Sequence, residues 1–134
     1  MGIRRQAREA AVQMLYAMDL NTEDNLDEAC KSFWNRRKGP AAVREFANRL
    51  TRSVVEHRPQ LDEIISKYCT TWDFDRVGAI ERNVLRLALY EILHCDDIPH
   101  QVSINEAIEI AKLFGTDKSG AFVNGLLDAV VKDL

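Results

Sequence analysis

The sequence predicts an all-helical protein, and three observations support this fold class. Apolar residues recur at intervals of three and four residues in one segment after another, which is the spacing of one face of an α-helix. Proline, glycine and polar capping residues separate these segments. No stretch of useful length shows the alternation of a half-buried strand. At 134 residues, the chain is most simply one domain spanning residues 1–134.

Seven segments follow this helical pattern. The first carries Ala11 and Leu15 on its buried side, and Pro40 begins the third. The fifth is apolar nearly all round after Asn83, so we expect it to be the central helix of a bundle. The expected ranges are 4–20, 27–37, 40–57, 59–68, 76–94, 103–114 and 117–131.

The boundary between the last two helices has recognisable capping residues. Ser103 and Glu106 have the spacing of a capping box, in which each side chain satisfies a backbone N–H of the first turn. Gly115 follows the sixth helix, where a left-handed closing residue is common. Thr116 or Asp117 is then available to cap the seventh helix.

The seventh helix contains two interior glycines, Gly120 and Gly125, and Asn124 between apolar neighbours. A glycine inside a helix costs about 1 kcal/mol relative to alanine, so its presence needs a reason. We expect the glycines to allow close contact with a neighbouring helix, and Asn124 to cap a neighbouring backbone group.

Composition excludes several classes of protein. The chain is 46% hydrophobic and 29% charged, as is usual for a globular domain. No apolar run approaches the roughly 20 residues that span a bilayer, and the basic N-terminus lacks an apolar signal core. We therefore expect a cytoplasmic protein with no membrane association. The three cysteines, Cys30, Cys69 and Cys95, are odd in number and suit small buried side chains in a reducing compartment better than a disulfide framework.

Positive charge is concentrated at the N-terminus. The net charge is −3, but residues 1–8 hold Arg4, Arg5 and Arg8 and no acid, leaving 15 basic and 21 acidic residues elsewhere. Arg4 and Arg8 share one side of the first helix, because they are four residues apart. Cations at a helix start oppose the macrodipole. The cluster therefore favours either an external anion or a simple solvated end, and the residues alone leave both open.

Catalytic and metal chemistry find little support in the sequence. His94, Cys95 and His100 lie too close together for the separated ligand pairs of a structural zinc site. No P-loop, dinucleotide-binding turn or nucleophile elbow is present. We expect no catalytic residue, no metal and no cofactor, and hence a protein that is not an enzyme.

Three motifs resemble one protein family in matching order. They are RRQAREAAVQMLY near the N-terminus, ERNVLRLALYEIL in the fifth helix and INEAIEIAKLFGTDKSGAFVNGLLD across the last two helices. Together they resemble the NusB family of bacterial transcription antitermination factors. The resemblance implies a NusB-like fold of two small helical bundles. It also implies binding to boxA RNA of nascent ribosomal RNA transcripts with NusE, a small-subunit ribosomal protein, to promote read-through by RNA polymerase.

The resemblance also implies particular site residues. The family's N-terminal arginine-rich segment contacts RNA, and the turn into the last helix lies near the RNA. Gln6 departs from the family pattern, which often has arginine there, and Lys118 stands where relatives can carry an acid. The implied RNA-binding residues are Arg4, Arg5, Arg8, Lys118 and Phe122, of which Phe122 is at helical core spacing as well. For NusE the resemblance implies Glu81, with Tyr16 near it.

Two other functions remain open at this stage. The same fold occurs as an accessory RNA-binding domain of ribosomal RNA cytosine methyltransferases. The printed chain has no following cofactor domain, so we expect at most a stand-alone relative of that domain. The alternative is a helical protein-interaction adaptor or homodimer with solvated arginines.

Overall fold

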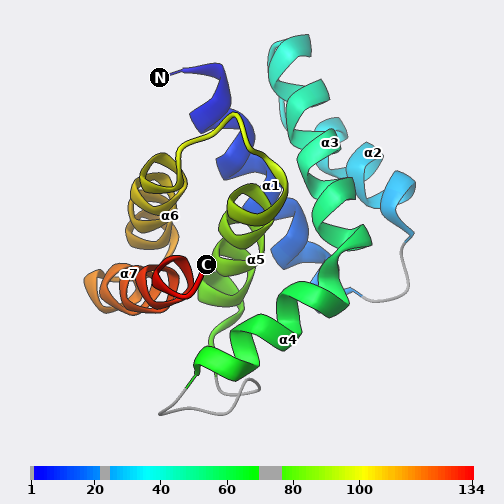
Figure 1. Ribbon diagram of the computed structural model, residues 1–134. Coiled ribbons are helices and arrows are strands. Elements are labelled where there is room, and N and C mark those ends of the chain that lie inside the picture. Colours follow the sequence, from blue (N-terminus) through cyan, green and yellow to red (C-terminus); the bar gives the residue numbers. More distant parts are fainter. Residues whose placement is uncertain (1, 22–24, 70–76) are drawn as a thin grey trace. The chain divides into compact units, whose positions relative to one another are not determined.

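The computed structural model describes residues 2–21, 25–69 and 77–134, and within them the chain forms helices and no strand (Figure 1). The all-helical fold class is confirmed, and the helices lie close to their expected ranges. The start expected for the fifth helix, at residue 76, lies outside the described residues. None of the described helices is long and apolar enough to cross a membrane. The helices are α1 (Ile3–Leu20), α2 (Leu26–Arg36), α3 (Ala41–Glu56), α4 (Arg58–Tyr68), α5 (Ala79–His94), α6 (His100–Phe114) and α7 (Asp117–Lys132).

The helices group into two compact units, Met1–Glu56 with α1 to α3 and His57–Leu134 with α4 to α7. In the first unit α1 packs against both α2 and α3. Alanines at the contact keep the helix axes close, and the aromatic ring of Phe33 fills the space beside them. The buried core of this unit consists of Ala7, Ala10, Met14, Cys30, Phe33, Val43 and Ala47.

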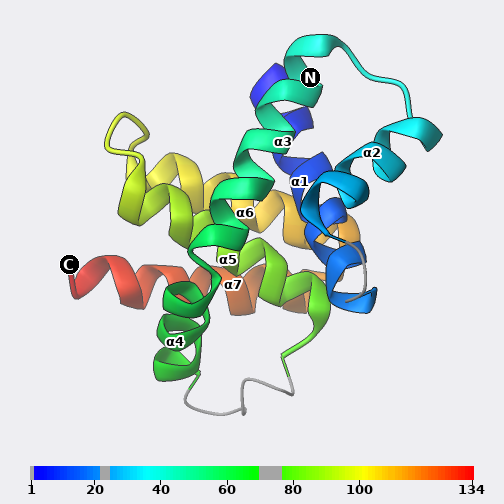
Figure 2. The same cartoon turned by 90° about the vertical axis from the view of Figure 1, so that its right-hand side faces the viewer.

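In the second unit α5 packs against α4, α6 and α7, and α6 packs along α7 (Figure 2). The central position expected for α5 is thus confirmed. Burying each leucine or isoleucine side chain contributes about 1.5–3 kcal/mol, so a helix covered on several sides holds much of the unit's stability. The largest fully buried aliphatic side chains of this unit are Leu61, Ile65, Leu85, Leu89, Ile110 and Leu127.

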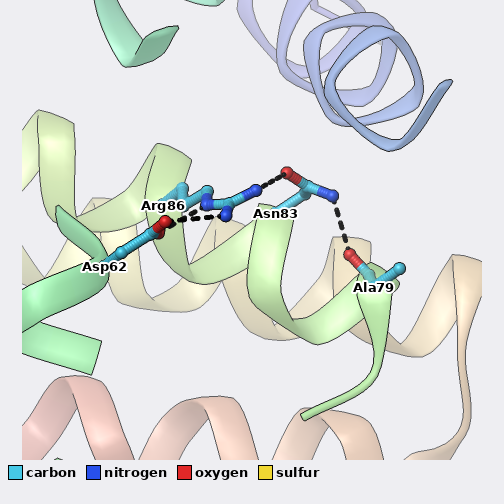
Figure 3. Close-up of polar contacts among 4 residues, drawn as sticks. All are labelled: Asp62, Ala79, Asn83 and Arg86. Atoms are coloured by element: carbon cyan, nitrogen blue, oxygen red, sulfur yellow. Dashed lines mark hydrogen bonds and ion pairs between the residues drawn. The ribbon is translucent and has the colours of Figure 1, made fainter. Parts of the chain in front are cut away.

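A buried arginine on α5 was not anticipated from the apolar pattern. Arg86 is 5% exposed, and its Nε and one terminal nitrogen donate to the two carboxylate oxygens of Asp62 on α4, at 2.6 and 2.9 Å (Figure 3). Its other terminal nitrogen donates to Asn83 Oδ1 at 3.0 Å, and Asn83 Nδ2 donates to the carbonyl of Ala79 at 2.8 Å. Such a two-bond arginine–carboxylate pair fixes α4 against α5 in one orientation.

The capping box expected at Ser103 and Glu106 is wrong. Helix α6 begins at His100, one turn earlier, so Ser103 lies inside it and is buried. The Ser103 hydroxyl donates instead to Glu91 Oε1 on α5 at 2.9 Å, which satisfies a buried carboxylate. A capping signal and a buried serine in a helix interior use the same residue type, and the sequence did not distinguish them.

At the α6–α7 boundary one expectation is confirmed and one is wrong. Thr116 caps α7: its Oγ1 accepts the Ser119 N–H at 3.3 Å, and Ser119 Oγ accepts the Thr116 N–H at 3.1 Å. Gly115 is not a left-handed closing residue, since its φ is −118°.

The two glycines of α7 differ. Gly120 is buried, and a Cβ there would lie 2.9 Å from Lys112 Cγ on α6, so it does allow close contact. Gly125 is exposed, and a Cβ there would have nothing within 4 Å, so its expected packing role is wrong. Asn124 is also exposed and, among the described residues, makes no hydrogen bond that would cap a neighbouring backbone group.

Candidate RNA and protein interfaces

The start of α1 presents the N-terminal arginines unequally. Gly2 is the residue before the helix, no side chain caps the first turn, and that turn contains no acid. Arg4 is exposed, with its guanidinium carbon 5.6 Å from the centre of the Phe46 ring on α3. Arg5 is half-buried and has a partner within the protein. Arg4 is therefore the arginine of the predicted cluster most available to an external anion.

Arg8 occupies a different environment. Its side chain is 4% exposed and has interaction partners inside the protein. A buried guanidinium must be paired or hydrogen-bonded to offset its lost hydration. In this conformation an RNA phosphate would reach Arg8 only after a rearrangement.

In the second unit, three of the predicted residues surround one cavity of about 330 Å³. Glu81 on α5 and Lys118 and Phe122 on α7 all line it. Lys118 is exposed and Phe122 is half-buried, so the ring of Phe122 contributes to the wall of the cavity rather than to the closed core. The structure thus brings the residue implied for NusE next to the two implied for RNA.

Glu81 has a structural role as well. It lies in the first turn of α5, where a carboxylate is favoured by the helix dipole. Its Oε1 accepts a hydrogen bond from the Ser119 hydroxyl of α7 at 3.3 Å. Its other oxygen would clash with a Cβ at Gly78, so a residue larger than glycine there would displace the Glu81 side chain from this position. Glu81 therefore links the starts of α5 and α7.

Tyr16 lies on α1 in the first unit and is half-buried. Its accessible part leaves it available for contact with another molecule.

Charge divides between the two units. The first unit, residues 1–56, contains ten lysines and arginines and eight acidic residues, a net charge of +2. The second, residues 57–134, contains eight and thirteen, a net charge of −5. Such asymmetry steers a polyanion towards the first unit and a basic partner towards the second.

The described residues offer no group of three or more His, Cys, Asp or Glu side chains that could hold a metal ion. Cys30 is buried, and burial raises the pKa of its thiol above the ordinary value, with the same cause acting on the pKa of Cys69. Raised thiol pKa values keep sulfur protonated at neutral pH and poorly nucleophilic.

These features define a two-unit, all-helical protein with a cationic surface at the start of its first helix and an acidic second unit. The NusB family model matches residues 5–132. The transcription antitermination protein NusB of Thermodesulfovibrio yellowstonii is 42% identical to this chain, over 97% of this chain and 92% of its own length. That of Myxococcus xanthus is 44% identical, over 97% of this chain and 95% of its own length. The chain belongs to the NusB family.

Solved structures agree with that assignment. A solved structure of T. maritima NusB is 39% identical to this chain, with a TM-score of 0.87, and the match covers 96% of this chain and 90% of that one. The crystal structure of the antitermination factors NusB and NusE in complex with dsRNA contains a chain that is 32% identical with a TM-score of 0.86, covering 100% of this chain and 99% of that one.

Proposed function

We propose that this protein is a transcription antitermination factor that binds RNA together with NusE. The observation that carries the proposal is the full-length match to a chain from the complex of NusB, NusE and dsRNA. Relatives above 40% identity that are named transcription antitermination protein NusB support the same function. The RNA is boxA of nascent ribosomal RNA transcripts, and the assembly acts within the RNA polymerase antitermination complex.

The RNA site includes the start of α1. Arg4 and Arg5 supply the first contacts, and Arg8 supports the helix from the interior. The absence of any acid in the first turn supports this, because no carboxylate of that turn competes with an external anion for the arginines. Lys118 and Phe122 add contacts from the start of α7, where the amine neutralises a phosphate and the ring offers a face for a base.

NusE binds through Glu81 and Tyr16. A ribosomal protein is basic, and the second unit carries a net charge of −5, which supports an acidic contact there. We further propose that the chain acts as one domain, works in the cytoplasm and is not an enzyme. A homodimer of the free protein is part of the same proposal.

The proposal is tested by electrophoretic shift of boxA RNA with and without NusE. Charge reversal of Arg4 and Arg5 should weaken RNA binding while the protein stays folded, because each lost phosphate contact removes about 0.7 from the salt slope on single-stranded RNA. Lys31→Glu on α2 is the control, since Lys31 is also exposed in the first unit. Equal affinities in all variants would refute the assignment of the RNA site, and no binding by the wild type would refute the function.

A further inference from the structure

A second arginine, on a different helix from Arg4, lies next to the same aromatic ring. Phe46 of α3 is half-buried against the core of the first unit, and its ring has two guanidinium groups next to it. Arg4 of α1 lies 5.6 Å from the ring centre, and Arg49 of α3 lies 5.5 Å from it. Both distances fall within the roughly 6 Å range of cation–π contacts. One ring therefore holds two cations from separate helices.

Neither cation has a carboxylate partner among the described residues. Glu45 precedes Arg49 by one turn, at a spacing that allows an ion pair, yet the two do not form one. Arg52, three residues after Arg49 on the same helix, behaves differently, since it donates to Asp27 Oδ1 at 2.6 Å. The contrast on one helix marks Arg49 as uncompensated.

Two uncompensated positive charges beside one ring make the surface around Phe46 cationic in the free protein. Phosphates that bind the two groups neutralise this charge. Because Phe46 packs against the core, the ring that both guanidinium groups contact has a fixed position on the surface. Guanidinium groups also match phosphate geometry with paired N–H donors.

We propose that Arg4, Phe46 and Arg49 form a continuation of the RNA site, in which backbone phosphates of RNA bind both guanidinium groups. The RNA path then runs from the first turn of α1 onto α3. This inference rests on the proposed function. RNA is favoured over an acidic peptide because the two arginines join an N-terminal arginine cluster in a unit with a net charge of +2.

The test is Arg49→Gln with Arg52→Gln as its matched control, measured in the full chain with boxA RNA across a salt series. Arg49→Gln should lower the slope of log affinity against log salt by about 0.7. A contact with that slope corresponds to about a fivefold change in affinity for each tenfold change in salt. Arg52→Gln should leave the slope unchanged. Thermal melting of both variants shows that each remains folded.

Phe46→Leu provides a second measurement, because leucine keeps the position apolar and removes the ring. Phe46→Leu should weaken RNA binding in the wild-type background. It should weaken binding less in the Arg49→Gln background, because the ring then contacts only one guanidinium group.

Three outcomes overturn the inference. The first is an Arg49→Gln variant with the same salt slope as Arg52→Gln, while charge reversal of Arg4 and Arg5 still weakens RNA binding. That outcome leaves the proposed function standing. The second is loss of NusE binding alone, which would make the surface a contact for NusE and not for RNA. The third is a wild-type protein that does not bind RNA, which removes the proposed function as well.

Discussion

Gly125→Ala should stabilise the protein. Gly125 lies inside α7, is exposed, and has nothing within 4 Å of the position that a Cβ would take. The described residues include no glycine with positive φ, so alanine fits the backbone without strain. Alanine is favoured over glycine in a helix interior by about 0.8–1 kcal/mol.

The size of the expected shift in melting temperature follows from chain length. Unfolding entropy is about 2.1 cal/mol/K per residue near 60 °C, which for 134 residues is roughly 0.28 kcal/mol/K. A gain of about 1 kcal/mol therefore raises the midpoint by about 3–4 °C. This is well within the resolution of calorimetry or of circular dichroism at 222 nm.

Gly120→Ala is the matched control on the same helix. Its Cβ would lie 2.9 Å from Lys112 Cγ and 3.1 Å from Lys112 Cε, so the lysine side chain must move. The midpoint of Gly120→Ala should be below that of Gly125→Ala, because the same propensity gain is offset by this displacement. Combining Gly120→Ala with Lys112→Ala removes the obstacle and should recover the gain.

The reasoning would be refuted by a lower midpoint for Gly125→Ala than for the wild type. That result would mean that the open face of α7 at Gly125 is covered by another molecule in solution, or that the helix is strained there. Sedimentation velocity on the same sample separates these two causes, because only the first changes the oligomeric state.

Three further predictions follow from the second unit and the thiols. Glu81→Lys should weaken NusE binding more than RNA binding. Glu81→Gln is its control, because glutamine removes the charge but keeps an acceptor for the Ser119 hydroxyl. NusE binding by the Gln variant equal to that of the wild type would assign the loss in the Lys variant to helix destabilisation. Asp62→Asn should destabilise the protein by about 2–4 kcal/mol in urea melts, since it removes the carboxylate that pairs with the buried Arg86. An unchanged midpoint would contradict this. Cys30 should react with iodoacetamide at pH 8 more slowly in the native protein than in urea, because burial raises its thiol pKa, and equal rates would count against it.

Helical periodicity predicted the fold well because burial in this protein follows helix faces. Each segment of the expected pattern became a helix, and α5 proved central as its apolar surface indicated. Capping was less predictable. Ser103 has the right residue type and spacing for a helix start, but its hydroxyl donates to the buried Glu91 carboxylate on the preceding helix. A partner twelve residues away cannot be read from local spacing.

The buried polar residues of α5 show the same limit. Arg86 stands between apolar residues of α5, and helical periodicity alone does not predict that it is buried. Its position was itself a signal, because a buried arginine requires a carboxylate nearby. Which carboxylate it takes depends on how α4 packs against α5, and that is set by tertiary structure.

The arginines of the RNA site show why a linear pattern and a surface differ. Arg4 and Arg8 share a helix face, so the spacing predicts the same exposure for both. Helix face does not fix depth: Arg4 is exposed at the helix start, whereas Arg8, one turn further on, is 4% exposed. Depth is decided by what covers each turn of the helix. Arg4 and Arg49, far apart in the sequence, both lie next to the ring of Phe46. If the RNA follows this surface, a phosphate contact that the N-terminal cluster loses at Arg8 is restored from α3.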